Sequence, residues 1–438
     1  MTETYQLDEL INRTHTLMEE LNEKQIDRKE LIQLLVVSLF SLKHTFLLGE
    51  PGVSKTGILE IFSTAIESEK KFSITIKNDT KYEEIFGDRF RDESGRLQYD
   101  PAGSIVEASF AMIDETWKGN SKVMNSLLSI MSNYRTIEIM GKGQIKVPLL
   151  MVGGASNELP LDKEVRPLRD RFLFSYVVKK ITGEAQWIKF ASRQYDRVPV
   201  VETKFLPDEI LKIYELSNSV TIPQEIYSAL FNIRQKVVSL EIGVSERKFD
   251  GAIDVFLVSA FLNRREEVNF SELYFLLHIL WEKETDIPLI RKIVNDETFG
   301  QLDAVITTYD EICKTENWLL SLLNGRMNSF IKHRKAFSFE EEESFDSQCN
   351  DVLLLADEFA KVLSSLDFLG RHYDMNMMIE KQTEDNYLMT EHVSPVYFNF
   401  NIALVKESIT RNRKIEQFLR KWFDDYNAMY AYNEKVNF

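Results

Sequence analysis

The apolar positions of the first 180 residues follow two different rhythms. From about residue 7 to residue 42 they recur at the three- and four-residue spacing of a helix. Short apolar runs bounded by polar, glycine or proline residues then follow, and such runs are typical of buried strands. The runs are Thr45–Leu48, Phe72–Ile76, Phe110–Ile113, Leu149–Val152 and Phe172–Val178. Helical stretches such as Gly57–Glu67 and Lys122–Met131 lie between several of them, which predicts a mostly parallel sheet with helices on its faces.

Beyond the last of these strands the pattern is helical almost throughout. Pro207, Pro223 and Pro288 lie near expected helix starts or loops, and an apolar helix is expected over Glu272–Trp281. From residue 286 onward the pattern predicts long amphipathic helices, which are typical of a bundle. We therefore predict an α/β domain over residues 1–182, a helical block over 183–285 and a helical C-terminal domain over 286–438.

The composition agrees with this division and excludes several classes of protein. A length of 438 residues corresponds to about three domains. With only 17 glycines and 10 prolines, an all-β protein with many tight turns is disfavoured. The two cysteines, Cys313 and Cys349, are far apart in the sequence, so neither a disulfide scaffold nor a cysteine zinc site is expected. The net charge of -16 argues against a broad nucleic-acid-binding surface.

Neither a transmembrane segment nor a secretory signal is expected. The sequence has no run of about 18 apolar residues, and its start lacks the basic and apolar regions of a signal peptide. The resulting prediction is a cytoplasmic protein. The 6 histidines include no HExxH motif and no clustered pair, so a histidine-based metal site is not expected.

A candidate phosphate-binding loop follows the first predicted strand. Its residues are Gly49, Glu50, Pro51, Gly52, Val53, Ser54, Lys55 and Thr56. They match the pattern GxxxxGK[ST] except that Ser54 stands where the last glycine is expected, and the required strand and helix flank the loop. Backbone N–H groups at a helix N-terminus favour a phosphate anion. Lys55 is expected to reach the β- and γ-phosphates and Thr56 to bind Mg²⁺; a chance turn is the alternative.

Two carboxylates end the third predicted strand. Asp114 is expected to lie beside the phosphate loop and to hold Mg²⁺. Glu115, one residue further, is a candidate general base for the attacking water. Asn157 follows the next strand and is a candidate for orienting that water. The alternative for each is a polar residue in an ordinary loop or turn at the end of a strand.

With these motifs, the chain resembles the MoxR family of AAA+ ATPases, and within it the RavA branch. The resemblance covers roughly residues 5–285. The segments that carry it are Gly49–Thr56, Glu84–Gly87, Phe110–Lys118, Asn125–Leu128, Ala155–Pro160, Arg169–Phe172 and Val244–Phe249. It implies a P-loop AAA+ core with a parallel sheet, followed by an all-α lid, and it implies ATP and Mg²⁺ as nucleotide and metal.

The resemblance also implies roles for single residues. Asp114 resembles the magnesium-site acid and Glu115 the catalytic base, while Asn157 matches the residue known as sensor 1. Arg171 matches the arginine finger, which reaches the nucleotide of the neighbouring subunit, and Arg169 is a second candidate for that role.

One lid residue also receives a role. Arg247 matches sensor 2, a lid arginine that contacts the γ-phosphate of its own subunit. A solvated helix face is the alternative for Arg247. For Arg169 and Arg171 the alternative is a surface salt bridge with Asp170 or Glu164.

An insertion and two departures complete the comparison with the family. Lys77–Glu107 occupies the place of the helix-2 insert, a hairpin-bearing element that faces the central pore in this clade, and Gly95 and Gly103 fit turns there. Thr116 stands where an apolar residue is expected. The region beyond about residue 286 does not match the partner-binding insertion of the RavA branch.

The function expected from the resemblance is that of an ATP-driven remodeller. A hexameric ring would bind ATP between subunits and act on a protein client. A von Willebrand factor A-domain protein is the expected partner, and the C-terminal helices are the expected docking region. Two other functions stay open: a nucleotide-gated scaffold with little turnover, and a nucleic-acid motor of a defence or restriction system, against which the acidic charge weighs.

Overall fold

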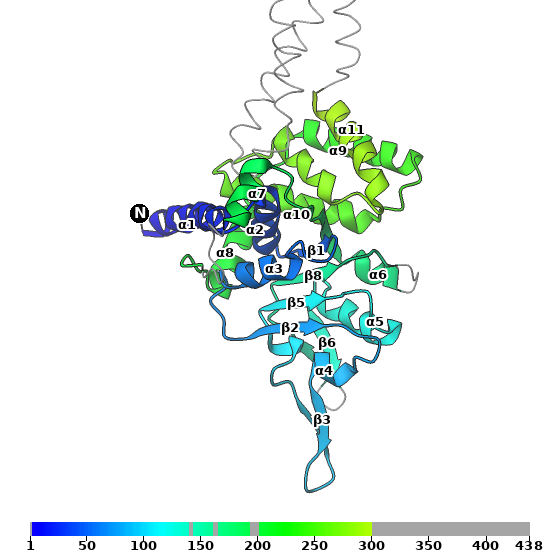
Figure 1. The fold of residues 1–438 in the computed structure, drawn as a ribbon. Coiled ribbons are helices and arrows are strands. Elements are labelled where there is room, and N and C mark those ends of the chain that lie inside the picture. The colour runs from blue at the N-terminus through cyan, green and yellow to red at the C-terminus, as the bar shows by residue number, and fades with distance from the viewer. Residues whose placement is uncertain (1, 140–142, 161–164, 193–200, 300–438) are drawn as a thin grey trace, which may run out of the picture. The chain divides into compact units, whose positions relative to one another are not determined.

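The computed structural model of the chain describes residues 2–139, 143–160, 165–192 and 201–299 (Figure 1). Most of the predicted C-terminal domain and both cysteines therefore lie outside the described residues. Within the ranges given, none of the helices combines the length and the apolar character needed to cross a membrane.

A five-stranded parallel sheet forms the centre of the first domain, as the apolar runs predict. Its strands follow the order β2, β5, β8, β1, β9. They are β1 (His44–Leu48), β2 (Lys71–Thr75), β5 (Phe110–Asp114), β8 (Met151–Ser156) and β9 (Phe172–Val177). Every residue of β1 and β8 is buried, because both strands lie inside the sheet and helices cover its two faces.

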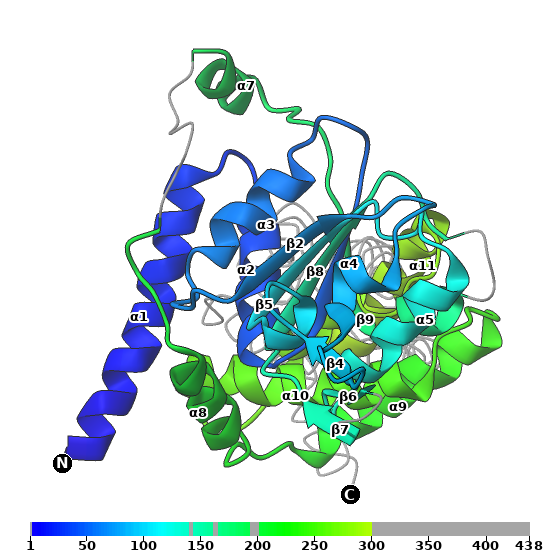
Figure 2. The ribbon, with the colours of Figure 1, turned by 90° about the horizontal axis from the view of Figure 1, so that it is seen from below.

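The helices of the first domain lie on both faces of this sheet. They are α1 (Thr2–Lys24), α2 (Lys29–Phe40), α3 (Lys55–Ser63), α5 (Ser121–Ile130) and the short α6 (Arg166–Arg169). Helices α2 and α3 cover one face and α5 the other (Figure 2). The helical stretch predicted before the first strand consists of two helices, α1 and α2. Gly153 of β8 lets α3 approach closely, since a Cβ atom there would come within 2.7 Å of the Leu59 side chain.

Two antiparallel hairpins extend the core. The strands of the first are β3 (Asp88–Arg91) and β4 (Leu97–Asp100), and those of the second are β6 (Thr136–Ile139) and β7 (Gly143–Lys146). The first hairpin projects away from the sheet (Figure 1). It lies in the segment predicted as the insert, together with α4 (Tyr82–Phe86) and η1 (Ile105–Glu107). Gly95 and Gly103 adopt φ angles of 79° and 73°, so the predicted glycine turns are confirmed.

The second half of the described chain is helical, as predicted. Its elements are α7 (Glu184–Ala191), α8 (Pro207–Ser217), α9 (Gln224–Ser239), α10 (Glu246–Leu262), η3 (Phe270–His278), η4 (Glu284–Asp286) and α11 (Ile287–Phe299). Pro207 is the first residue of α8, where its missing N–H costs no helical hydrogen bond. Glu297 of α11 forms an ion pair of 2.7 Å with Lys236 of α9 and accepts from Asn232 at 3.1 Å. These contacts join α11 to the helices before it, past the boundary predicted at residue 285.

Two predicted elements differ in the structure. The apolar helix expected over Glu272–Trp281 is a 3₁₀ helix over Phe270–His278. All residues from 271 to 280 are buried, so the segment has no polar face from which a helical period of 3.6 could be recognised. The strand expected at Leu149–Val152 begins two residues later and continues to Ser156, because two buried glycines extend it beyond the apolar run.

Candidate active site

The phosphate loop joins the end of β1 to the start of α3, as its motif predicts. Gly52 and Ser54 both have left-handed backbone, with φ angles of 84° and 66°. This conformation costs a non-glycine residue about 1–2 kcal/mol. Ser54 therefore adopts the conformation of the glycine that it replaces in the motif. Gly49 is required for space, since a Cβ atom there would lie 2.6 Å from the backbone oxygen of Val178.

Lys55 begins α3, and its ammonium group contacts the loop from which the helix starts. Its Nζ donates hydrogen bonds to the backbone oxygens of Gly49 at 2.7 Å and Glu50 at 3.0 Å. It also donates to Oδ1 of Asn157 at 2.6 Å. Burial lowers the pKa of Lys55, and two nearby carboxylates oppose that shift. The charge of this lysine is thus held close to the backbone amides that favour an anion.

The two carboxylates predicted from the sequence lie beside this lysine. Thr56 Oγ1 donates to Oδ2 of Asp114 at 3.1 Å, so the two groups predicted to hold Mg²⁺ are together. The backbone N–H of Glu115 donates to Oδ1 of Asp114 at 2.9 Å. Glu115 Oε1 accepts a hydrogen bond from Asn157 Nδ2 at 3.2 Å. Since β1, β8 and β5 are parallel neighbours, their carboxyl ends deliver these side chains to one edge of the sheet.

The arginines predicted for the same reaction lie at the opposite end of the strands. Arg171 directly precedes β9, and Phe172, the first residue of β9, pairs with His44 at the start of β1. The phosphate loop begins at the other end of β1. The five residues of β1 span about 16 Å at roughly 3.3 Å per residue. Arg171 is therefore remote from the phosphate loop of its own chain.

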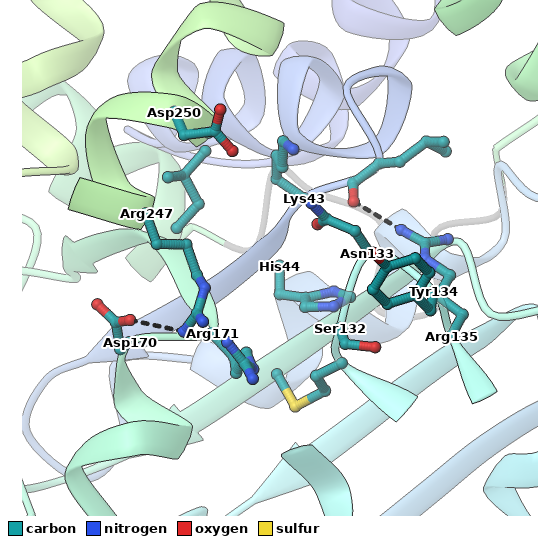
Figure 3. A pocket seen from close by; sticks show the side chains of 14 residues that line it. Lys43, His44, Ser132, Asn133, Tyr134, Arg135, Asp170, Arg171, Arg247 and Asp250 are labelled. Atoms are coloured by element: carbon teal, nitrogen blue, oxygen red, sulfur yellow. Dashed lines mark hydrogen bonds and ion pairs between the residues drawn. The ribbon is translucent and has the colours of Figure 1, made fainter. Parts of the chain in front are cut away.

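A polar cavity of about 280 Å³ lies at this end of the sheet (Figure 3). The acidic and basic residues that line it are Lys43, His44, Arg135, Asp170, Arg171, Arg247 and Asp250. Arg247 Nη1 forms an ion pair of 2.9 Å with Asp170 Oδ2, and Ser245 Oγ donates to the other oxygen of that carboxylate. Burial, and then the charge of Arg247, lowers the pKa of Arg171. Arg247 thus lies beside Arg171, and this placement does not fit the expected contact with the γ-phosphate of its own subunit.

Arg169 points to a different environment from that of Arg171. Arg169 is 5% exposed, and its Nη2 donates to the backbone oxygens of Trp281 at 3.3 Å and Glu282 at 3.0 Å. Its guanidinium carbon lies 5.4 Å from the centre of the Trp281 ring. Arg169 therefore connects the core to the helical block of its own chain, and Arg171 is the better candidate for an arginine finger.

Three functional or structural cations were missed by the sequence reasoning. Lys118 Nζ lies 3.2 Å from Glu115 Oε2. Arg135 donates to the backbone oxygen of Leu42 at 2.6 Å, and burial lowers its pKa to about 10. Lys248 is buried and donates to two backbone oxygens at the start of β9, and burial lowers its pKa to about 8. Of these three contacts, only that of Lys118 could have been found in the sequence, because Lys118 follows Glu115 by three residues. The contacts of Arg135 and Lys248 join segments that are distant in the sequence.

Comparisons with known proteins find similar chains for both parts of the described region. A family model described as the MoxR domain in the MoxR–vWA–β-propeller ternary systems matches residues 12–212. A second, described as an AAA lid domain, matches residues 225–294.

Single relatives extend these matches. An uncharacterized protein of Methanocaldococcus jannaschii is 30% identical over 316 residues, which cover 72% of this chain and 82% of that protein. The chaperone MoxR1 of Mycobacterium tuberculosis is 32% identical over 156 residues, or 34% of this chain and 40% of that protein. A crystal structure from Cytophaga hutchinsonii, provisionally named an ATPase, is 17% identical with a TM-score of 0.53. It covers 68% of this chain and 96% of its own, and it supports the fold alone.

Proposed function

The chain belongs to the MoxR family of AAA+ ATPases, and we propose that it hydrolyses ATP to ADP and phosphate with the help of Mg²⁺. The observation that carries the proposal is the meeting of five side chains at one edge of the sheet. These are Lys55, Thr56, Asp114, Glu115 and Asn157. Their chemistry is that of phosphoryl transfer, in which charge must be neutralised and a water molecule positioned.

The phosphate loop supplies the binding groups. The backbone N–H groups of Gly49–Thr56 would cradle the phosphates at the N-terminus of α3. Lys55 now donates to three uncharged oxygens. Phosphate oxygens carry negative charge and are stronger acceptors for an ammonium group, so Lys55 would turn to them. The hydroxyl of Thr56 and the carboxylate of Asp114 offer the oxygen ligands that Mg²⁺ prefers, and the ion when bound would neutralise phosphate charge.

The hydrolytic step is assigned to Glu115. Its carboxylate would accept a proton from the water whose oxygen attacks the γ-phosphorus, while the bond to the bridging oxygen of ADP breaks. Asn157 contacts both Lys55 and Glu115. It is therefore suited to orient the water between the γ-phosphate and the base.

Arg171 and Arg247 are proposed to act on the nucleotide of a neighbouring copy of the chain. Both lie at the end of β1 opposite the phosphate loop, about 16 Å away by the length of the strand. A side chain does not bridge that distance within one chain, whereas a second copy can bring its cavity to the loop. An oligomer is thus part of the proposal, and a hexameric ring is the form that the family resemblance implies. Arg169 is left out of this role because its own chain surrounds it.

A chaperone-like remodelling of a protein client is the proposed use of this ATPase. The matched family model is named for systems that contain a von Willebrand factor A domain and a β-propeller, so proteins of both kinds are the proposed partners. MoxR1, a relative, carries the name of a chaperone. A place in the RavA branch, a cytoplasmic location and docking through the C-terminal residues remain parts of the same proposal.

The test compares wild type with Glu115→Gln in ATP turnover and in assembly. Glu115→Gln is expected to lose about 10³-fold in turnover because it removes the base, while it still binds ATP and assembles. Glu107→Gln is the control, since Glu107 forms an exposed ion pair of 3.1 Å with Lys70 outside the site. Wild-type turnover in Glu115→Gln would contradict the proposal. Negligible turnover of the wild type, even with partners present, would instead favour a nucleotide-gated scaffold.

A further inference from the structure

Four side chains form a continuous polar chain that leads away from the phosphate loop. Lys55 Nζ lies 2.6 Å from Asn157 Oδ1, and Asn157 Nδ2 lies 3.2 Å from Glu115 Oε1. Glu115 Oε2 then lies 3.2 Å from Lys118 Nζ. The first three residues already have roles in the proposed function. Lys118 is the remaining member, and it contacts the proposed base directly.

The two oxygens of Glu115 have different partners. Oε1 accepts from Asn157, which also binds Lys55, so this oxygen is on the side of the phosphate loop. Oε2 forms an ion pair of 3.2 Å with the ammonium group of Lys118, and among the described residues it accepts no hydrogen bond. An amide on one oxygen and a cation on the other fix the plane of the carboxylate, which otherwise rotates in a broad torsional well.

The backbone after β5 explains why Lys118 reaches Glu115. Glu115 has a left-handed φ of 51°. The backbone N–H of Lys118 donates to the backbone oxygen of Glu115 at 2.9 Å, which closes a tight turn. Trp117, between them, packs at 5.0 Å from the ring of Phe46 and at 5.8 Å from that of Phe172. The inward packing of this ring anchors the turn. Lys118 lies on the outer side, where its side chain is 48% exposed.

We propose that Lys118 is a positioning residue that aims the carboxylate of Glu115 at the attacking water, an inference that rests on the proposed function. Lys118 pairs with Oε2 and so leaves Oε1, which accepts from Asn157, on the side where the γ-phosphate would lie. A reacting group that is displaced by about 1 Å loses up to about 100-fold in rate. Loss of the ammonium group should therefore slow the chemical step and leave ATP binding intact.

The experiment measures kcat and KM for ATP in the full chain carrying Lys118→Met or Lys118→Arg. Lys118→Met keeps the length of the side chain but removes its charge, and kcat is expected to fall about tenfold with KM within about twofold of wild type. Lys118→Arg keeps the charge and should recover most of the rate. Lys70→Met is the matched control, because it breaks an exposed ion pair of similar length, 3.1 Å, outside the site. That variant should keep the wild-type kcat.

A double mutant separates positioning from a merely structural role. If Lys118 acts through Glu115, adding Lys118→Met to Glu115→Gln should lower the residual rate by less than twofold, since coupled residues are not additive. A full further tenfold loss would overturn the proposal, as would a wild-type kcat in Lys118→Met. Where Glu115→Gln loses turnover but Lys118→Met does not, the proposed function stands and only the role of Lys118 falls. Where Glu115→Gln keeps turnover, both are overturned.

Discussion

In the proposed function, the two ends of strand β1 supply different parts of one reaction. At its carboxyl end, Lys55 and Asn157 contact each other and lie beside two carboxylates. At its amino end, Arg135, Arg171 and Arg247 line a polar cavity. Arg247 forms an ion pair with Asp170, an acidic residue of the same cavity. The carboxyl end offers a binding place for phosphates and a general base. The amino end offers cations, but the phosphate loop of the same chain is too far away for them to contact a phosphate bound there. The proposed function therefore requires a site that is completed between two copies of the chain.

The largest expected effect comes from removing a cation at the amino end. Arg171→Ala should lower ATP turnover by about 10³-fold or more, the usual loss for an arginine finger, while ATP still binds to the intact loop. Arg247→Ala should lower turnover less, since its charge is partly neutralised by Asp170. Steady-state ATPase rates and nucleotide titrations check both. Unchanged turnover in Arg171→Ala would remove the amino end from the reaction.

Arg169 should separate stability from catalysis at the same end. Arg169→Ala removes a buried cation that bonds to two backbone oxygens and to Glu282, so the free energy of unfolding should fall by about 3 kcal/mol. Denaturant unfolding measures this loss. At temperatures at which Arg169→Ala is folded, it should retain ATP turnover. An Arg169→Ala protein that is as stable as wild type but inactive would contradict this and would show that the guanidinium group of Arg169 takes part in the reaction.

Lys248 should make the stability of the folded chain depend on pH in the alkaline range. Burial lowers the pKa of Lys248 to about 8 in the folded chain, against about 10.4 when unfolded. Between these values the unfolded state binds more protons, so the stability of the wild type should rise with pH, by up to about 3 kcal/mol. Lys248→Met should lack this rise. Unfolding curves at pH 7.5 and pH 10 test the difference, and equal pH dependence in both proteins would contradict the assignment.

The smallest expected effect lies in the phosphate loop. Ser54 has a φ of 66°, so Ser54→Gly should relieve left-handed strain and raise the free energy of unfolding by about 0.5–1 kcal/mol. Ser54→Ala keeps the strain and serves as the control. Thermal melts check both variants. A lower melting temperature in Ser54→Gly would mean that the serine side chain, and not the backbone, determines the loop.

The carboxyl end could be predicted from the sequence because its residues belong to local motifs. Lys55 and Thr56 are adjacent, Asp114 and Glu115 end one apolar strand, and parallel strands bring their ends together. The amino end could be predicted only in part. Arg171 was assigned as an arginine finger by resemblance, and in the structure it lines a cavity. Arg247 was assigned a contact with the γ-phosphate of its own subunit, which its ion pair with Asp170 does not support.

The sheet followed from short apolar runs, and the limits of that pattern have physical causes. The glycines of β8 are buried without being strongly apolar, so the pattern ends the strand at Val152, four residues before its end at Ser156. In η3 burial on every side removes the periodicity that identifies a helix. Arg169 and Arg171 are two residues apart in one sequence motif, and only tertiary packing distinguishes the buried one from the one at the cavity.

The most direct test of a shared site combines two variants that are each inactive. Lys55→Ala lacks the phosphate loop lysine but keeps the arginine cavity, and Arg171→Ala has the opposite defect. The two chains, carrying different tags, are expressed together, purified through both tags and assayed for ATP turnover. The account predicts that the mixed assembly regains turnover well above the sum of the separate variants, because some interfaces then join an intact loop to an intact arginine. A mixed assembly as inactive as its components would contradict it.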